Sequence, residues 1–272
     1  MVGLVFDEAV DDAPLLRWGD AGKVGADVAV TTRRGGVSAP PYDTLNLGLH
    51  VGDDAADVVA NRGRAAGAFG AGLGELVFAR QVHGAAAVVV DSGDAGRGAR
   101  AEDDAVADAD VLVTSTPGVT LVILVADCVP LAFVDPVAGV LAVVHAGWRG
   151  TAVGVVGAAL DAMAERGADA ARVRAWVGPG VAADRYQVGD EVRDGLAAAV
   201  GPAALDERVA RPDGPGHWLV DLAAANRQQL RLRGVPSGQI HDCGVTTADE
   251  RFFSDRAARP CGRFALLARL VD

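Results

Sequence analysis

The sequence predicts an α/β domain with a mixed β-sheet, and three observations predict it. Half of the 272 residues are hydrophobic and 22% are charged, a balance that supports one sizeable buried core. Four apolar, β-branched runs follow one another between residues 111 and 148. Further along, apolar residues at helical spacing alternate with short strand-like runs, and the hairpins between the strands favour a mixed sheet over a purely parallel one.

The N-terminal part of the chain predicts strands separated by long polar segments. Residues 1–25 carry no clear periodicity and are expected to form an irregular lead. The polar segment 32–48 is long for a loop in a compact domain, and such loops are usually functional or disordered. In order, we expect a strand over 26–32, the loop over 32–48, a strand–turn–strand unit over 76–90 and a surface loop over 91–104.

The remaining part predicts alternating strands and helices. Within 151–166, Val153, Val156 and Leu160 recur at helical spacing, and Gly167 supplies a left-handed stop. No segment resembles a linker, so we expect a single domain over 1–272. The expected elements are strands at 111–114, 118–128, 130–136 and 139–148, a helix at 151–166, a strand at 172–178, a helix at 188–200, a strand at 217–221, a helix at 221–234, and strands at 239–244 and 264–270.

The charge balance excludes several functions. With 25 Lys+Arg against 36 Asp+Glu the formal net charge is −11, and no basic block is present. Binding to nucleic acid or to an anionic membrane surface is not expected, because both need clustered cations. Lys23 is the only lysine, which argues against Schiff-base chemistry. Arginines or backbone amides would therefore hold any bound anion.

Cysteine usage and the apolar segments indicate a cytoplasmic protein. Cys128, Cys243 and Cys261 form an odd set without the spacing of a disulfide scaffold, and the N-terminal residues lack the features of a signal peptide. Aspartates and prolines divide the apolar stretch 118–148 into pieces of strand length, so no membrane span is expected. The chain is long enough to fold independently as a monomer.

Three side chains at strand ends have the chemistry of metal ligands. His83, Cys128 and His145 each stand where an apolar run stops. Side chains at neighbouring strand ends can converge, and two imidazoles with one thiolate match a catalytic zinc site that keeps one tetrahedral position open. Spacing alone leaves the alternative of a buried, inert thiol with two hydrogen-bonded core histidines.

Eight ordered motifs resemble one known family. The resemblance is to the YfiH-type family, also called the multicopper polyphenol oxidase or laccase-domain proteins and the peptidoglycan editing factor group, and it covers about residues 28–270. The motifs are TRRGGVSAPPYDTLNLGLHVGDD, NRGR, RQVHG, ADCVPLAFVDP, HAGWRGT, VGPGV with YQVGDEV, DLAAANRQQL, and DERFFSDR with GRFALL.

The resemblance implies a fold, a metal site and an activity. It implies one domain with mixed β-sheets layered between α-helices and a metal site at His83, Cys128 and His145. It also implies a zinc-dependent purine nucleoside phosphorylase that acts on adenosine, inosine, guanosine and methylthioadenosine and deaminates adenosine, so that purine nucleosides and phosphate are the expected partners. A multicopper cluster would need more imidazoles than the five histidines present, but a single Cu²⁺ could occupy the Zn²⁺ site.

The hypothesis of phosphorylase activity suggests candidate catalytic residues. Phosphorolysis needs an anion site beside the ribose, and Arg33, Arg62 and Arg149 lie in family motifs. Arg149 is expected at a helix N-terminus, which also favours an anion. Asp127 is the candidate proton shuttle for deamination. As alternatives, the arginines bridge surface carboxylates and Asp127 accepts structural hydrogen bonds.

Three further residues are candidates for substrate binding. Ser38 and Asn46 carry groups that can hydrogen-bond a ribose or phosphate oxygen, and Trp148 can stack on a purine. A plain turn and a core tryptophan are the alternative roles. Competing functions are a cysteine hydrolase with Cys128 activated by a histidine, a hydrolase that edits peptidoglycan precursors, a copper-dependent polyphenol oxidase, and a metal-binding protein without turnover.

Overall fold

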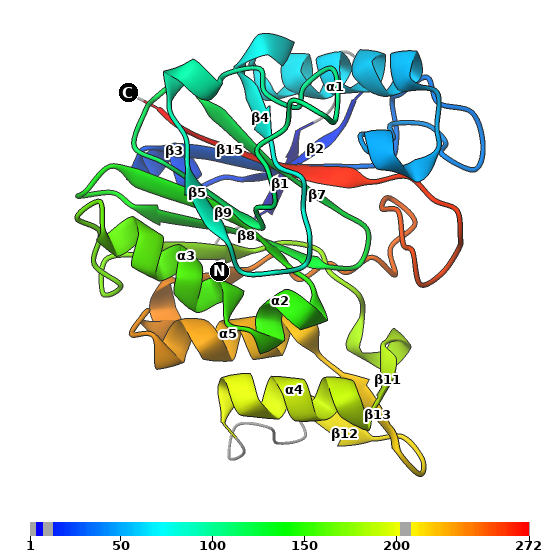
Figure 1. Ribbon diagram of the computed structural model, residues 1–272, viewed down its shortest axis with the longest axis vertical. Coiled ribbons are helices and arrows are strands. Elements are labelled where there is room, and N and C mark those ends of the chain that lie inside the picture. The colour runs from blue at the N-terminus through cyan, green and yellow to red at the C-terminus, as the bar shows by residue number, and fades with distance from the viewer. Residues whose placement is uncertain (1–3, 8–12, 202–207, 272) are drawn as a thin grey trace.

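Two six-stranded mixed sheets stack face to face and form the centre of the molecule (Figure 1). The structure, a computed structural model, describes residues 4–7, 13–201 and 208–271. In these ranges the strand order is β1-β2-β3-β15-β7-β4 in the first sheet, β14-β10-β8-β9-β6-β5 in the second, and β11-β13-β12 in a small third sheet. The strands are β1 (Leu4–Asp7), β2 (Leu15–Trp18), β3 (Ala26–Thr31), β4 (Leu76–Phe78), β5 (Ala87–Val89), β6 (Val111–Thr114), β7 (Thr120–Val125), β8 (Val129–Asp135), β9 (Val140–Ala146), β10 (Arg174–Val177), β11 (Gln187–Gly189), β12 (Ala210–Pro212), β13 (His217–Val220), β14 (Ile240–Asp242) and β15 (Phe264–Leu270).

Helices cover the outer faces of the stacked sheets. Helix α1 packs on the first sheet, and α3 and α5 pack on the second, which gives the layered α/β fold that the sequence predicted (Figure 1). Along β15, Leu266 belongs to the core between the sheets and Leu267 to the core under α1. Strands buried on both faces read as continuous apolar runs. The helices are α1 (Ala55–Phe69), α2 (Trp148–Ala152), α3 (Val155–Ala164), α4 (Asp190–Val200) and α5 (Leu222–Leu232).

The irregular lead that we expected over residues 1–25 is wrong for its described part, residues 4–7 and 13–25, which is regular; the rest of the lead lies outside the described residues. In the described residues, β1 pairs with β2 and β2 pairs with β3, all antiparallel, and a short 3₁₀ helix (Ala21–Val24) joins β2 to β3. Leu16 and Trp18 enter the core between the sheets, and Leu15 enters the core under α1. With both faces of such a short strand buried, no alternation is left to identify it.

Two helices also differ from the prediction. The expected helix over 151–166 is two helices, because Gly154 adopts a left-handed conformation with φ of 84° and separates α2 from α3. Helix α1 was not predicted, since alanines and glycines dilute its apolar face. The residue types at its two ends are nevertheless typical helix caps. The Asp54 side chain accepts hydrogen bonds from two backbone N–H groups of the first turn, and Gly70 ends the helix in a left-handed conformation.

The chain crosses between the two large sheets at two places that matter for the site. The unit over 76–90 is not a hairpin, because β4 pairs with β7 in the first sheet and β5 pairs with β6 in the second. Likewise β7 lies in the first sheet and the next strand, β8, in the second. We call the two connections, residues 79–86 and 126–128, the sheet crossings. In the described ranges, no helix is both long enough and apolar enough to span a membrane.

Candidate metal centre

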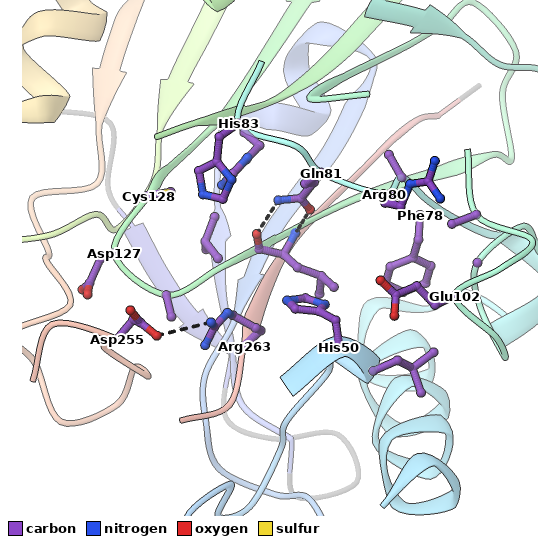
Figure 2. A pocket seen from close by; sticks show the side chains of 18 of the residues that line it. His50, Phe78, Arg80, Gln81, His83, Glu102, Asp127, Cys128, Asp255 and Arg263 are labelled. Carbon is purple, nitrogen blue, oxygen red and sulfur yellow. Dashed lines mark hydrogen bonds and ion pairs between the residues drawn. The ribbon is translucent and has the colours of Figure 1, made fainter. Parts of the chain in front are cut away.

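His83, Cys128 and His145 meet where the two sheet crossings approach the end of β9. One ligand atom of each lies within 4.8 Å of those of the other two. His83 belongs to the first crossing and Cys128 to the second, and Figure 2 shows them on the same side of the cavity. The centroids of the two imidazole rings are 4.7 Å apart, and the rings meet edge to face. This is the one such group of three or more potential ligands found among the described residues.

Strand pairing explains how Cys128 and His145 come together. In β9, Val143 belongs to the core between the sheets and Val144 to the core under the helices. Because side chains alternate along a strand, His145 shares the inner face with Val143. Pro130 of β8 is directly opposite His145, so Cys128, two residues earlier, lies on the same face and beside it.

A buried carboxylate holds both histidines. Asp110 is fully buried, and its Oδ1 accepts a hydrogen bond of 2.7 Å from Nδ1 of His145. The same carboxylate accepts the backbone N–H groups of Val82 at 3.3 Å, His83 at 3.0 Å and Gly84 at 2.7 Å. These bonds fix the turn in which His83 adopts a φ of 62°, a left-handed conformation that is uncommon for a non-glycine residue.

The sulfur and the imidazoles shift one another's pKa. Burial alone would raise the pKa of the Cys128 thiol, but the charge and hydrogen bonds of His145 and His83 outweigh this and lower it to about 6. Burial opposes protonation of His145, whereas the Cys128 thiolate and Asp110 favour it and raise its pKa to about 9. In the metal-free protein at neutral pH, the pair is therefore a thiolate beside an imidazolium.

This pKa predicts a pH-dependent reactivity. In metal-free protein we expect iodoacetamide to alkylate Cys128 rapidly above pH 6 and progressively more slowly as the pH falls through 6, since only the thiolate is nucleophilic. Cys243 is the internal control, because burial raises the pKa of its thiol to about 12. Peptide mass spectrometry reads both sites, and equal rates at the two cysteines would contradict the assignment. Bound zinc is expected to protect Cys128.

The donor set fits a zinc or copper ion. Two imidazole nitrogens and one thiolate are ligands that both ions accept, and three protein ligands leave a fourth position for substrate or solvent. Because Nδ1 of His145 is engaged with Asp110, its Nε2 is the nitrogen left for an ion. Gly147 makes this convergence possible: a Cβ there would lie 2.9 Å from Sγ of Cys128 and 3.0 Å from Cδ2 of His83.

The three ligands line a cavity of about 590 Å³. It is large enough for a nucleoside and a small anion. Positive and negative side chains both face it, as Figure 2 shows for Arg80, Arg263, Glu102 and Asp255. Its lining also includes Leu49, His50, Arg62, Phe78, Gln81, Leu124, Asp127, Trp148, Tyr186, Arg256 and Arg259.

Asp127 lines this cavity next to Cys128. Its Oδ1 accepts a hydrogen bond from the Thr247 hydroxyl, and its Oδ2 accepts one of 2.6 Å from the backbone N–H of Arg256. Asp127 also has a left-handed backbone, with φ of 93°. Both carboxylate oxygens thus tie the second crossing to the C-terminal segment, which is the structural role weighed as an alternative to proton transfer.

Arg62 also lines the cavity, but the backbone engages its guanidinium group. It donates hydrogen bonds to the carbonyl oxygens of Leu47, Gly98 and Ala99, and it lies 3.9 Å from the ring centroid of Phe78. Burial lowers the pKa of Arg62 to about 10. These bonds engage Nε and Nη1 and hold the 32–48 loop and the 91–104 loop together at the cavity wall. The role of Arg62 in phosphate binding stays a prediction.

Arg33, Ser38 and Asn46 are not among the residues that line this cavity. Arg33 bonds the backbone carbonyl and the carboxylate of Asp43, and Ser38 and Asn46 both donate to the carboxylate of Asp53. The three side chains therefore hold the 32–48 loop in shape. Gly36 lets the same loop close, because a Cβ there would collide with the carbonyl oxygen of Thr44.

Trp148 lines the cavity, whereas Arg149 is not among its lining residues. The Arg149 guanidinium lies over the Trp148 ring, 4.5 Å from its centroid, and so covers one face of the indole. The helix that begins here, α2, has only five residues. Arg149 does lie in the first turn of a helix, as expected, but its role as a phosphate ligand stays a prediction.

Several cavity residues were missed although the sequence motifs contained them. Arg256, Arg259 and Arg263 come from the segment after β14, and Tyr186 precedes β11. Arg259 and Arg263 both pair with Asp255, while the ion pairs of the described residues include none for Arg256. The motifs DERFFSDR, GRFALL and YQVGDEV contain Arg256, Arg263 and Tyr186, and Arg259 lies between the first two motifs. Loop arginines carry no periodic signal that would mark them.

The fold, together with a His–Cys–His group that could hold a metal ion, defines a protein of the laccase-like class. Residues 27–271 match the family described as multi-copper polyphenol oxidoreductase laccase, and the chain belongs to this YfiH-type family. It is 42% identical over 251 residues to a purine nucleoside phosphorylase of Mycobacterium bovis, covering 92% of this chain and 94% of the relative. Another protein of that name, from Streptomyces coelicolor, is 44% identical over 242 residues, covering 89% and 94%.

Solved structures of relatives have the same fold. YlmD from Geobacillus stearothermophilus superimposes with a TM-score of 0.92 at 36% identity, covering 99% of this chain and all of the relative. The YlmD protein of Geobacillus stearothermophilus is named purine nucleoside phosphorylase. The Bacillus licheniformis protein YfiH superimposes with a TM-score of 0.91 at 33% identity, covering 97% and 98%. These matches confirm the fold and the family that the sequence motifs indicated.

Proposed function

We propose that this protein is a zinc-dependent purine nucleoside phosphorylase. Its substrates would be adenosine, inosine, guanosine or methylthioadenosine together with inorganic phosphate, and adenosine would also be deaminated. One observation carries the proposal: the donors of His83, Cys128 and His145 converge on the wall of a cavity that also presents arginines. The phosphorylase names of relatives that align over nearly the whole chain support it.

We assign the groups that phosphorolysis needs to side chains that line the cavity. Phosphate attacks the anomeric carbon of the ribose, the bond to the purine breaks, and the base leaves. A bound zinc ion would supply a Lewis acid beside the substrate. Arg256, Arg259 and Arg263 offer guanidinium groups for the anion. Tyr186 offers a neutral hydroxyl donor, because burial and the nearby Cys128 thiolate raise its pKa to about 12.

Arg256 is the arginine that we assign to phosphate. Its guanidinium donates one bond to the carbonyl oxygen of Gln187 and has no carboxylate partner among the described residues. We expect Arg256→Gln to raise KM for phosphate about 10- to 100-fold, with little change in KM for the nucleoside. This factor corresponds to the free energy that one charge-assisted hydrogen bond contributes to binding. Steady-state kinetics with phosphate varied at saturating nucleoside measures this effect.

Arg80→Gln is the matched control. Arg80 lines the same cavity, but its guanidinium pairs with Asp108 at 2.8 Å, so its positive charge is already compensated. We expect a much smaller effect on KM for phosphate. Equal effects of the two substitutions would show that general positive potential, and not a site at Arg256, attracts the anion.

Deamination needs a group that carries a proton from the attacking water to the departing amine. Asp127 remains our candidate because it lines the cavity beside Cys128, although both its oxygens accept hydrogen bonds. Asp127→Asn would keep the size of the side chain. Loss of inosine formation with phosphorolysis retained would support the shuttle role, and parallel loss of both activities would support the structural role.

The deciding experiment for the function is product identification. Zinc-loaded protein is incubated with adenosine, and separately with inosine, guanosine and methylthioadenosine, with and without phosphate, and the products are separated by chromatography. Adenine and ribose 1-phosphate that form only with phosphate would establish phosphorolysis, and inosine would establish deamination. No product from any of the four nucleosides would refute the proposal. Repeating the assay after loading with Cu²⁺ and with a phenolic substrate tests the oxidase alternative.

A cysteine hydrolase is the second candidate, favoured by the thiolate character of Cys128 beside His145. Hydrolysis of peptidoglycan precursors would belong to this chemistry. The two candidates respond oppositely to chelation. Removal of zinc should abolish phosphorolysis reversibly, whereas it should leave a cysteine hydrolase intact or activate it, because the nucleophile is then free.

A further inference from the structure

Among the described residues outside the three ligands, Asp110 has a side chain whose hydrogen bonds reach two of the metal-ligand residues. It accepts Nδ1–H of His145 and three consecutive backbone N–H groups around His83. It stands immediately before β6, outside the family motifs that drew attention to the ligands, and it does not line the cavity. We propose that Asp110 is the positioning residue of the metal centre, an inference that rests on the proposed metal-dependent function.

The first part of the argument concerns His145. A carboxylate without a proton can only accept, so the nitrogen facing it at 2.7 Å must carry the proton. The proton on Nδ1 leaves the lone pair of Nε2 available for an ion. Asp110 thus selects the tautomer of His145 that can bind metal and fixes the orientation of its ring.

The second part concerns His83. The backbone of His83 is left-handed, a conformation that a β-carbon disfavours. Its N–H bonds Oδ1 of Asp110, and the N–H groups of Val82 and Gly84 bond Oδ2. These three bonds hold the turn that presents the imidazole. One buried carboxylate therefore places a ligand in the first sheet crossing and a ligand on β9 relative to each other.

Asp110→Asn tests this role. An amide keeps the size of the carboxylate but replaces one acceptor oxygen with a donor, so either the His145 ring or part of the His83 turn loses its acceptor. We expect the dissociation constant for Zn²⁺ to rise about 10- to 100-fold, as for other residues that hold metal ligands through hydrogen bonds. Competition with a chromophoric chelator gives the constant. The absorption spectrum of the Co²⁺-loaded protein reports a changed ligand geometry.

Asp135→Asn is the matched control. Asp135 is equally buried and also accepts three backbone N–H groups, those of Val137, Ala138 and Asp169, but its side-chain partner is Arg172. Asp135→Asn should lower the free energy of unfolding about as much as Asp110→Asn does. Zn²⁺ affinity and the Co²⁺ spectrum of the folded protein should stay as in the wild type. Equal weakening of Zn²⁺ binding by both variants, or wild-type binding by Asp110→Asn, would overturn the proposal.

A measurement on the unaltered protein covers the case in which Asp110→Asn does not fold. Nitrogen-15 labelled histidine in the Zn²⁺-loaded protein should show His145 bonded to the ion through Nε2, with its proton on Nδ1. Coordination through Nδ1 would overturn the role of Asp110 while leaving the metal site intact. Failure of the wild type to bind Zn²⁺ would instead refute the metal-dependent function itself, so the two failures are distinguishable.

Discussion

Replacing Cys128 with serine is expected to remove stoichiometric zinc and to lower kcat/KM for phosphorolysis by about a thousandfold or more. A serine hydroxyl does not ionise near neutral pH, whereas the two imidazoles lower the pKa of the Cys128 thiol to about 6 and so supply a thiolate. An ion that stabilises charge in the transition state contributes several kcal/mol, which corresponds to three powers of ten or more. Elemental analysis and the nucleoside assay measure the two losses.

Cys243→Ser is the control for this substitution. Cys243 is also a buried thiol, it does not line the cavity, and its sulfur donates to the carbonyl oxygen of Val245, a bond that a hydroxyl can replace. Zinc content and kcat/KM should therefore remain at wild-type values. If Cys128→Ser retained one equivalent of zinc and its activity, the metal centre would have to lie elsewhere.

Gly147→Ala is expected to weaken zinc binding about 100-fold while the protein stays folded. The backbone of Gly147 has φ of −75° and ψ of 171°, which alanine adopts without strain. The added methyl group would lie 2.9 Å from Sγ of Cys128 and 3.0 Å from a carbon of His83, so the cost falls on the ligands. Overpacking of this kind costs about 1–3 kcal/mol. Isothermal titration with Zn²⁺ measures the change.

Gly67→Ala provides the comparison. Gly67 lies inside α1, and beyond its chain neighbours and the nearby backbone of its own helix no atom lies within 4 Å of the Cβ that alanine would add. The substitution should leave zinc affinity unchanged and raise the free energy of unfolding by about 0.5–1 kcal/mol, because alanine favours the helix. Unaltered zinc binding by Gly147→Ala would show that the ligands have room to move apart and that the site is not rigid.

The strands and helices that the sequence predicted are those with a clear periodicity or a long apolar run. Strands β6 to β9 read as continuous apolar segments because both their faces are buried. The strand β2 is largely buried too, but Arg17 interrupts its short apolar run, so neither a continuous run nor a clear alternation marks it in the sequence. The pairing of strands was not predictable either, because β4 and β5 are close in sequence but belong to different sheets.

The candidate ligands could be identified from their residue types. The chain has only five histidines and three cysteines, so His83, Cys128 and His145 were chosen from a small set. Arginine is too common here for the same reasoning, and lysine is almost absent. Arg33 therefore looked equivalent to Arg256 in the sequence, and only the structure shows that Asp43 engages the first while the second faces the cavity. Asp110 carried no signal, because its importance comes entirely from what it contacts.

The two sheet crossings give a bound ion a second effect. His83 and Cys128 lie on separate strand connections that join the same pair of sheets, and His145 ends a strand of one of them. An ion held by all three would act as a cross-link between segments that are far apart in the unfolded chain. Zinc at about a hundred times its dissociation constant would add about 2.7 kcal/mol to the free energy of unfolding. Loss of zinc would then leave the protein both inactive and easier to denature or degrade.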